Sequence, residues 1–233
     1  MRYGTIEPIK QIGEIAKKHD IYFHTDAVQA IGNVRIDVKD MNIDLLSMSG
    51  HKFYGPKGIG VLYAKKGINF SKIQNGGHQE RNKRAGTENV AGIVGIGKAI
   101  ELAYKDFGDK INYLKELRDY YIKKVEKNIS DIRINGDMDK RLAGNINISF
   151  KDIDGGELLL KLDEKGICVS TGSACNSETQ GASHVLTAIG LESCYANGSV
   201  RVSLGKDNTK DEIDYFVDVL KECVYELRKN KSI

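Results

Sequence analysis

The chain lacks the features that mark several large classes of protein. Its 233 residues include no tryptophan, only two prolines and only four cysteines. It has no run of about 18 apolar residues, which a membrane-spanning helix requires. Its N-terminus has no apolar core of a secretory signal, and the chain shows no internal repeat or low-complexity segment. These absences predict a protein that neither spans nor crosses a membrane.

The cysteines show neither metal-site nor disulfide spacing. The four are Cys168, Cys175, Cys194 and Cys223. There is no C-x-x-C pair and no neighbouring histidine pattern, so no metal site is expected, and a disulfide framework is not expected in a chain of this size. Reduced thiols in a cytoplasmic protein are the predicted state.

Charge is nearly balanced, with 35 Lys and Arg against 32 Asp and Glu and a formal net charge of +3. Because basic residues are interspersed with acidic ones, the pattern argues against a nucleic-acid or membrane partner. A chain of this length can bury a core and form one large or two small domains.

The spacing of apolar residues predicts an α/β fold for the first part of the chain. A helix is expected at 8–19, where Pro8 opens an amphipathic run, followed by strands at 21–24, 44–48 and 59–64. Apolar helices are expected at 90–107 and 111–129. The Gly108-Asp109 pair between them predicts a boundary, with one domain at 1–108 and another at 109–233.

The pattern of the second part of the chain, 109–233, predicts an α+β fold. Expected strands lie at 132–134, 145–150, 167–170 and 199–204, and expected helices lie at 157–164 and 183–189. The last helix begins at Thr209, where Thr-Lys-Asp-Glu forms a capping-box pattern with Glu212.

Lys52 and Asp26 are the residues that first suggest chemistry. Each follows an apolar run that reads as a strand, and open α/β sheets bind ligands at the carboxyl ends of their strands. A desolvated lysine amine loses its proton more easily and can form a Schiff base with an aldehyde. A carboxylate can keep the pyridine nitrogen of pyridoxal phosphate (PLP) protonated. Alone, a lysine in this place is usually a solvated surface residue, and an aspartate is usually part of a turn or a helix cap.

Several short motifs occur together and in order. They are Thr-Asp-Ala-Val-Gln at 25–29, Ser-Gly-His-Lys at 49–52, Tyr-Gly-Pro-Lys-Gly at 54–58, Arg-Ala-Gly-Thr-Glu-Asn at 84–89 and Ser-Ala-Cys at 173–175. This combination closely resembles the cysteine desulfurases of the class V aminotransferase group, from about Gly4 to the C-terminus. The resemblance implies a PLP cofactor and a partial PLP-dependent transferase fold type I large domain, followed by an α+β small domain.

The chain also departs from that family. Family members begin well upstream, with a phosphate loop and a histidine that stacks on the cofactor ring, and neither is present here. The expectation is therefore a C-terminal portion of a desulfurase, from truncation or a split gene. An incomplete sheet of this kind should expose an edge or an apolar face that another element must cover.

The resemblance assigns cofactor contacts to several residues. Lys52 would carry PLP and take the Cα proton of the substrate. Gln29 would hydrogen-bond the ring hydroxyl, and Ser49 and His51 would bind the phosphate. His51 by itself would pass for a structural histidine. Thr87 reads first as a helix N-cap, but its family counterpart binds the phosphate of the neighbouring subunit's cofactor, which implies a homodimer.

Cys175 and Arg201 are the expected substrate residues. Cys175 lies in a run of small and polar residues that predicts an exposed, mobile loop, whereas Cys168 and Cys223 fit buried apolar positions. Arg201 interrupts an alternating strand that needs no arginine for packing, and a guanidinium suits a carboxylate. It could instead face solvent. By resemblance, Arg201 binds the substrate's α-carboxylate and Cys175 receives its sulfur.

The implied reaction converts L-cysteine to L-alanine and leaves a persulfide on Cys175. A sulfur-acceptor or scaffold protein would then take the sulfur for iron–sulfur cluster or thio-cofactor assembly. Two alternatives stay open. One is an inactive desulfurase remnant that serves as a dimerisation or partner-binding module, and the other is a selenocysteine lyase.

Overall fold

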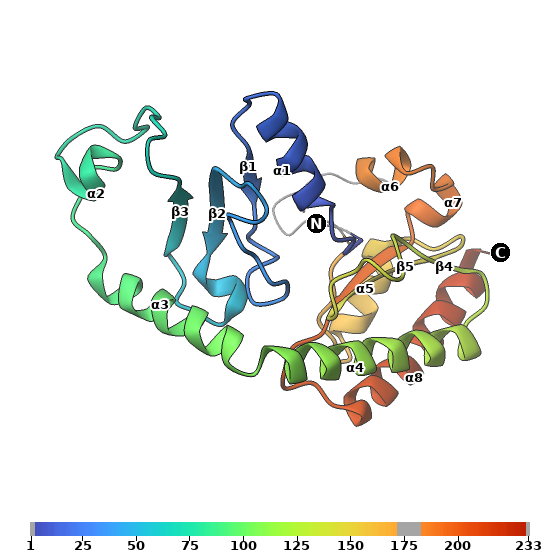
Figure 1. Cartoon of the computed structure of the whole chain (residues 1–233). Helices are drawn as coiled ribbons and strands as arrows, with labels where there is room; N and C mark the ends of the chain where they lie inside the picture. The colour runs from blue at the N-terminus through green and yellow to red at the C-terminus, as the bar shows by residue number, and fades with distance from the viewer. Residues whose placement is uncertain (1–2, 172–182, 232–233) are drawn as a thin grey trace. The chain divides into compact units, whose positions relative to one another are not determined.

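The structure is a computed structural model that describes residues 3–171 and 183–231. The chain forms two compact units. The first unit is Glu7–Phe107, and the second unit is Gly108–Ile233 together with Met1–Ile6. Each unit contains one three-stranded sheet (Figure 1).

The first unit has a mixed sheet. Its elements are α1 (Ile9–Lys18), β1 (His24–Asp26), β2 (Leu45–Ser49), the 3₁₀ helix η1 (Gly50–Phe53), β3 (Gly60–Ala64), α2 (Gln79–Asn82) and α3 (Val90–Lys105). The strand order is β1-β2-β3. β1 runs parallel to β2, with Asp26 opposite Ser47, and β3 runs antiparallel to β2. The carboxyl ends of β1 and β2 therefore lie at the same edge of the sheet.

One face of this sheet packs into the core of the first unit. Ile43, Leu46, Phe53, Ile96 and Ala99 form a buried apolar cluster that joins β2, η1 and α3. Pro56 also lies against α3, where a Cβ on Gly95 would come within 2.5 Å of its ring. The loop that follows β2 is thus held at both ends by α3.

The second unit contains an antiparallel sheet flanked by helices. Its elements are α4 (Phe107–Asn128), β4 (Ile132–Ile134), β5 (Asn145–Phe150), α5 (Gly155–Asp163), α6 (His184–Ala188), α7 (Ser193–Ala196), β6 (Ser199–Ser203) and α8 (Lys210–Lys231). The strand order is β4-β5-β6. Side chains from β5, α4, α5 and α8 form its core, including Ile146, Leu117, Leu158 and Leu220.

Most expected elements form, with shifts at their ends. The strands at 132–134 and 145–150 have the predicted bounds. The strand predicted at 21–24 is wrong in its bounds, because pairing with β2 begins at His24 and continues to Asp26. The strand predicted at 167–170 is also wrong. Within the described residues only Ser170 forms a bridge there, to Arg201.

The capping box at the start of α8 is confirmed. The Thr209 amide donates to Glu212 Oε2 at 2.9 Å, and the Glu212 amide donates to Thr209 Oγ1 at 3.2 Å. The hydrogen bond from the Thr209 amide, followed by one from the Asn208 side chain, lowers the pKa of Glu212. The ionised carboxylate is therefore the form that the folded state favours.

Thr209→Ala should lower the free energy of unfolding by about 1 kcal/mol at pH 7, because one helix N–H loses its cap.

Glu212→Gln should also destabilise the protein at pH 7. Since the folded-state pKa of Glu212 is depressed, its contribution is present above the ordinary pKa of about 4.3 and is lost as pH falls through the folded value. Urea unfolding at pH 7 and about pH 3 measures this. A Glu212→Gln effect that is equal at both pH values would contradict the carboxylate's role.

Candidate active site

The face of the first sheet opposite the core carries polar side chains. His24 in β1 and Ser47 in β2 are joined across the strands by a hydrogen bond of 2.8 Å between Nε2 and Oγ. Strand alternation places Asp26 and Ser49 on this same face, while Leu46 lies in the core. Sequence reasoning missed His24 and Ser47. The signal that could have found them is their two-residue spacing from Asp26 and Ser49.

Asp26 ends β1 with its carboxylate exposed. Its Oδ1 accepts a hydrogen bond of 2.9 Å from the Val28 amide, and the buried Ala27 donates from its amide to the Ser47 carbonyl. The backbone on both sides of Asp26 is therefore fixed. Gln29 follows in the next turn, also exposed, and its carbonyl accepts from the Asn33 side chain at 3.1 Å.

Lys52 lies in η1, directly after β2. The neighbouring Phe53 is only 4% exposed and anchors this short helix in the core. The Gly55 amide closes the loop on the Gly50 carbonyl at 2.9 Å. A Cβ at Gly55 would lie 2.8 Å from that carbonyl oxygen, so a larger residue would push the loop apart.

The expectation of a desolvated Lys52 is wrong for this chain as described. Its side chain is exposed, as is that of Asp26. The physical reason is that Phe53 takes the inward position on the 3₁₀ turn, which leaves Lys52 at the open edge of the sheet.

Ser49 and His51 form a pair beside Lys52. Ser49 Oγ and His51 Nδ1 are 2.9 Å apart, within hydrogen-bond distance. A hydroxyl and an imidazole at one point can both donate to an anion such as a phosphate. The sequence predicted these two residues as phosphate ligands, and the structure places them side by side.

The parallel pairing of β1 and β2 brings four of the six predicted cofactor residues to one sheet edge. Asp26 ends one strand, and Ser49, His51 and Lys52 end or follow the other. This edge is where open α/β sheets bind ligands. The set also fits PLP in kind, with a carboxylate for the pyridine nitrogen, a hydroxyl and an imidazole for the phosphate and an amine for the aldehyde.

Thr87 does not cap α3. The N-cap is Asn89, whose Oδ1 accepts a hydrogen bond of 3.0 Å from the Gly92 amide. Thr87 is exposed two residues earlier, and its carbonyl accepts from the Arg84 side chain at 3.5 Å. Its hydroxyl is therefore not needed by the helix.

The expected substrate residues belong to the second unit. Arg201 lies in β6, half-buried, and exchanges two backbone hydrogen bonds with Ser170. Cys175 lies outside the described residues. Cys223 is buried, and burial raises the pKa of its thiol, as predicted for a packing residue. The prediction of burial for Cys168 is wrong, because it is exposed.

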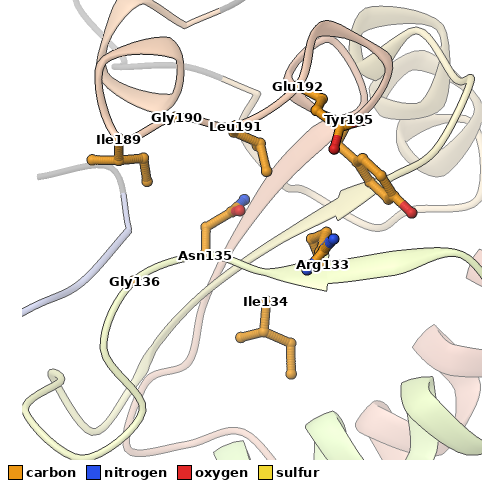
Figure 2. A pocket seen from close by; sticks show the side chains of 9 residues that line it. All are labelled: Arg133, Ile134, Asn135, Gly136, Ile189, Gly190, Leu191, Glu192 and Tyr195. Carbon is orange, nitrogen blue, oxygen red and sulfur yellow. The ribbon is translucent and has the colours of Figure 1, made fainter.

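A separate hollow of about 280 Å³ lies in the second unit. Its lining residues are Arg133, Ile134, Asn135, Gly136, Ile189, Gly190, Leu191, Glu192 and Tyr195. Figure 2 shows the side chains of Arg133 and Asn135 on the side of Tyr195, while Ile134 points to the other face of its strand. Among the residues that the structure describes, none of the predicted site residues lines this hollow.

Two absences hold for the described part of the chain. Its helices include none with the length and apolar character needed to cross a membrane. The same residues contain no group of three or more His, Cys, Asp or Glu side chains that could hold a metal ion.

Residues 2–216 match the family described as aminotransferase class-V. The chain belongs to the class V aminotransferase family. The expected fold class, a partial fold type I large domain followed by an α+β small domain, is confirmed by class V relatives of known structure.

Several relatives of this family member are named cysteine desulfurases. The cysteine desulfurase IscS of Dictyoglomus turgidum is 53% identical over 225 residues, which is 97% of this chain and 57% of that protein. A NifS-like protein of Rickettsia africae has a TM-score of 0.88 at 32% identity, covering 97% of this chain and 59% of the other. SspA in complex with cysteine has a TM-score of 0.72 at 38% identity, and the match covers 89% of this chain and 57% of SspA. The chain thus spans little more than half the length of these relatives.

Proposed function

We propose that this chain is the part of a PLP-dependent cysteine desulfurase that holds the cofactor lysine and the sulfur-accepting cysteine. The observation that carries the proposal is the convergence of Asp26, Ser49, His51 and Lys52 at one sheet edge. The high identity to relatives named cysteine desulfurases supports it.

The residues of the first unit would hold and serve the cofactor. When bound, PLP supplies an electron sink for the bonds to the substrate's Cα. Lys52 would anchor its aldehyde carbon and then, as a free amine, take and return the Cα proton. Asp26 would keep the pyridine nitrogen protonated, and Gln29 would hydrogen-bond the ring hydroxyl.

The phosphate would bind to the Ser49–His51 pair. Their mutual hydrogen bond holds the hydroxyl and the imidazole side by side before the anion arrives. When His51 Nδ1–H donates to Ser49 Oγ, the Ser49 hydroxyl remains available to donate to the phosphate. Thr87, whose hydroxyl is not used as a helix cap, would reach the phosphate of a second subunit's cofactor. This arrangement makes the proposed active form a homodimer with shared sites.

The substrate would be L-cysteine, consistent with a similar protein of known structure that is in complex with cysteine. Arg201 would bind its α-carboxylate with the guanidinium fork. The Cys175 thiolate would attack the substrate sulfur, forming an S–S bond as the C–S bond breaks. The electron pair of that C–S bond and a proton stay with the carbon skeleton, which leaves as L-alanine.

The persulfide on Cys175 would then pass its outer sulfur to a thiol of an acceptor or scaffold protein, for iron–sulfur cluster or thio-cofactor assembly. This chemistry requires the cysteine to stay reduced between turnovers. We therefore propose the cytoplasm as its setting, because thiols persist in reducing compartments.

Cys175→Ala tests the proposal. In the full-length or complemented enzyme this change should abolish sulfide release from L-cysteine under reducing conditions, because no thiolate remains to attack the substrate sulfur. The absorbance of bound PLP should be unchanged, since the variant keeps Lys52. Cys194→Ala is the matched control and should retain activity. Full activity of Cys175→Ala, or loss of activity only in Cys194→Ala, would refute the assignment.

A further inference from the structure

The hollow of the second unit lies against the polar face of that unit's sheet. Side chains alternate along β4, so Arg133 and Asn135 share one face while Ile134 packs against the core on the other (Figure 2). The other wall of the hollow is the segment 189–195, which leads into α7. Both walls belong to the second unit, so the hollow is formed within one compact body.

Asn135 presents a fixed hydrogen-bond acceptor at the hollow. The residue is only 4% exposed, and its Nδ2 donates to Asn147 Oδ1 at 2.6 Å and to Ser149 Oγ at 2.8 Å. Turning the amide over would place two carbonyl oxygens against each other, so Oδ1 keeps its direction. Among the described residues, Oδ1 has no hydrogen-bond partner. Because a nearly buried acceptor is costly to leave unpaired, this oxygen is suited to a ligand that donates a hydrogen bond.

Two groups of opposite charge line the same hollow. The Arg133 guanidinium lies over the Tyr195 ring, 5.5 Å from its centroid, which restrains its position. Glu192 Oε2 accepts only a weak hydrogen bond, from the Cys194 thiol at 3.6 Å. Within the described part of the chain, neither Arg133 nor Glu192 forms an ion pair. A cation and an anion that are both left without a counter-charge suit a ligand that carries both charges.

The size and the remaining lining of the hollow limit the ligand further. Its volume of about 280 Å³ lies just below the range of roughly 300–1,000 Å³ that is usual for sites of drug-sized molecules. Ile189 and Leu191 add apolar surface beside the polar groups. In Figure 2 the side chain of Asn135 is directed toward Leu191. The hollow therefore suits a small charged molecule with one apolar group.

We propose that this hollow binds a free α-amino acid with an apolar side chain. The α-carboxylate would accept hydrogen bonds from Arg133, and the ammonium group would donate to Asn135 Oδ1 and Glu192. The side chain would contact Ile189 and Leu191. Among the described residues the lining includes no proposed cofactor or substrate residue, so binding here would not require PLP.

Nuclear magnetic resonance of the ¹⁵N-labelled whole chain, without added PLP, tests the proposal with L-leucine as the probe. The backbone amides of Gly136 and Gly190 and the side-chain amide of Asn135 should shift saturably. L-leucinamide lacks the carboxylate, and N-acetyl-L-leucine lacks the ammonium group. Each should bind about tenfold more weakly than L-leucine, because one charged hydrogen bond is lost. Equal binding of all three compounds would show that only apolar contact is made.

Two substitutions at exposed positions identify which ligand group each residue binds. Arg133→Gln should weaken L-leucine binding about tenfold and remove its advantage over L-leucinamide. Glu192→Gln should instead reduce its advantage over N-acetyl-L-leucine. Lys127→Gln is the control, because Lys127 is an exposed cation in the last turn of α4 that does not line the hollow. Circular dichroism checks that each variant folds.

Arg201→Gln separates this hollow from the proposed substrate residue. L-leucine should still shift the amides of Gly136 and Gly190 in that variant. The proposal is overturned if L-leucine causes no saturable shift at the hollow, if Arg133→Gln binds it as tightly as the wild type, or if Arg201→Gln abolishes binding.

Discussion

Lys52→Ala is expected to abolish covalent attachment of PLP to the chain. Lys52 is the lysine at the shared carboxyl edge of β1 and β2, beside the Ser49–His51 pair that can hold the phosphate. In the active enzyme, turnover should also fall by about 100-fold or more, because the same amine is the proposed acid–base group. Borohydride reduction in the presence of PLP, followed by peptide mapping, measures the attachment.

Lys57→Ala is the matched control. Lys57 is also exposed and lies five residues further along the sequence, in the loop after η1. Its labelling therefore measures how readily an ordinary exposed lysine in this region reacts with an aldehyde. In the wild type, reduced PLP should be found on the peptide containing Lys52, and Lys57→Ala should keep this label. Label spread over several surface lysines, or retained at wild-type level in Lys52→Ala, would show that Lys52 is not the cofactor lysine.

Leu158→Ala should lower the free energy of unfolding of the second unit by about 2–5 kcal/mol. Leu158 on α5 is 0% exposed and packs in the cluster formed with β5, α4 and α8. Truncation removes buried methyl groups and leaves a cavity that rigid neighbours cannot fill. Urea unfolding followed by circular dichroism measures the loss.

Leu160→Ala makes the same chemical change two residues away on the same helix. Its side chain is 63% exposed, so the substitution removes little buried surface and should change stability by no more than about 0.5 kcal/mol. Equal effects of the two substitutions would mean that α5 does not pack on the sheet through Leu158.

Local signals in the sequence determined much of this protein. The Thr209–Glu212 capping box is formed by residues three apart, so the chain itself brings them together. The strands at 132–134 and 145–150 were predicted because their residue types favour extended backbone. Asp26 and Lys52 stand out as polar residues that follow apolar runs, whereas Ser49 and His51 were assigned through the resemblance to the family.

Only the tertiary structure decided which of these residues meet and which are exposed. The His24–Ser47 hydrogen bond depends on the register of β1 against β2, which no short segment encodes. Asn89, not Thr87, caps α3, because the Asn89 side chain is the one that accepts the hydrogen bond of the Gly92 amide. Cys168 is exposed although both of its neighbours in sequence are apolar, and Lys52 is exposed although Phe53 beside it is buried. Burial depends on which distant segments cover a residue, and that is a property of the packed fold rather than of the local sequence.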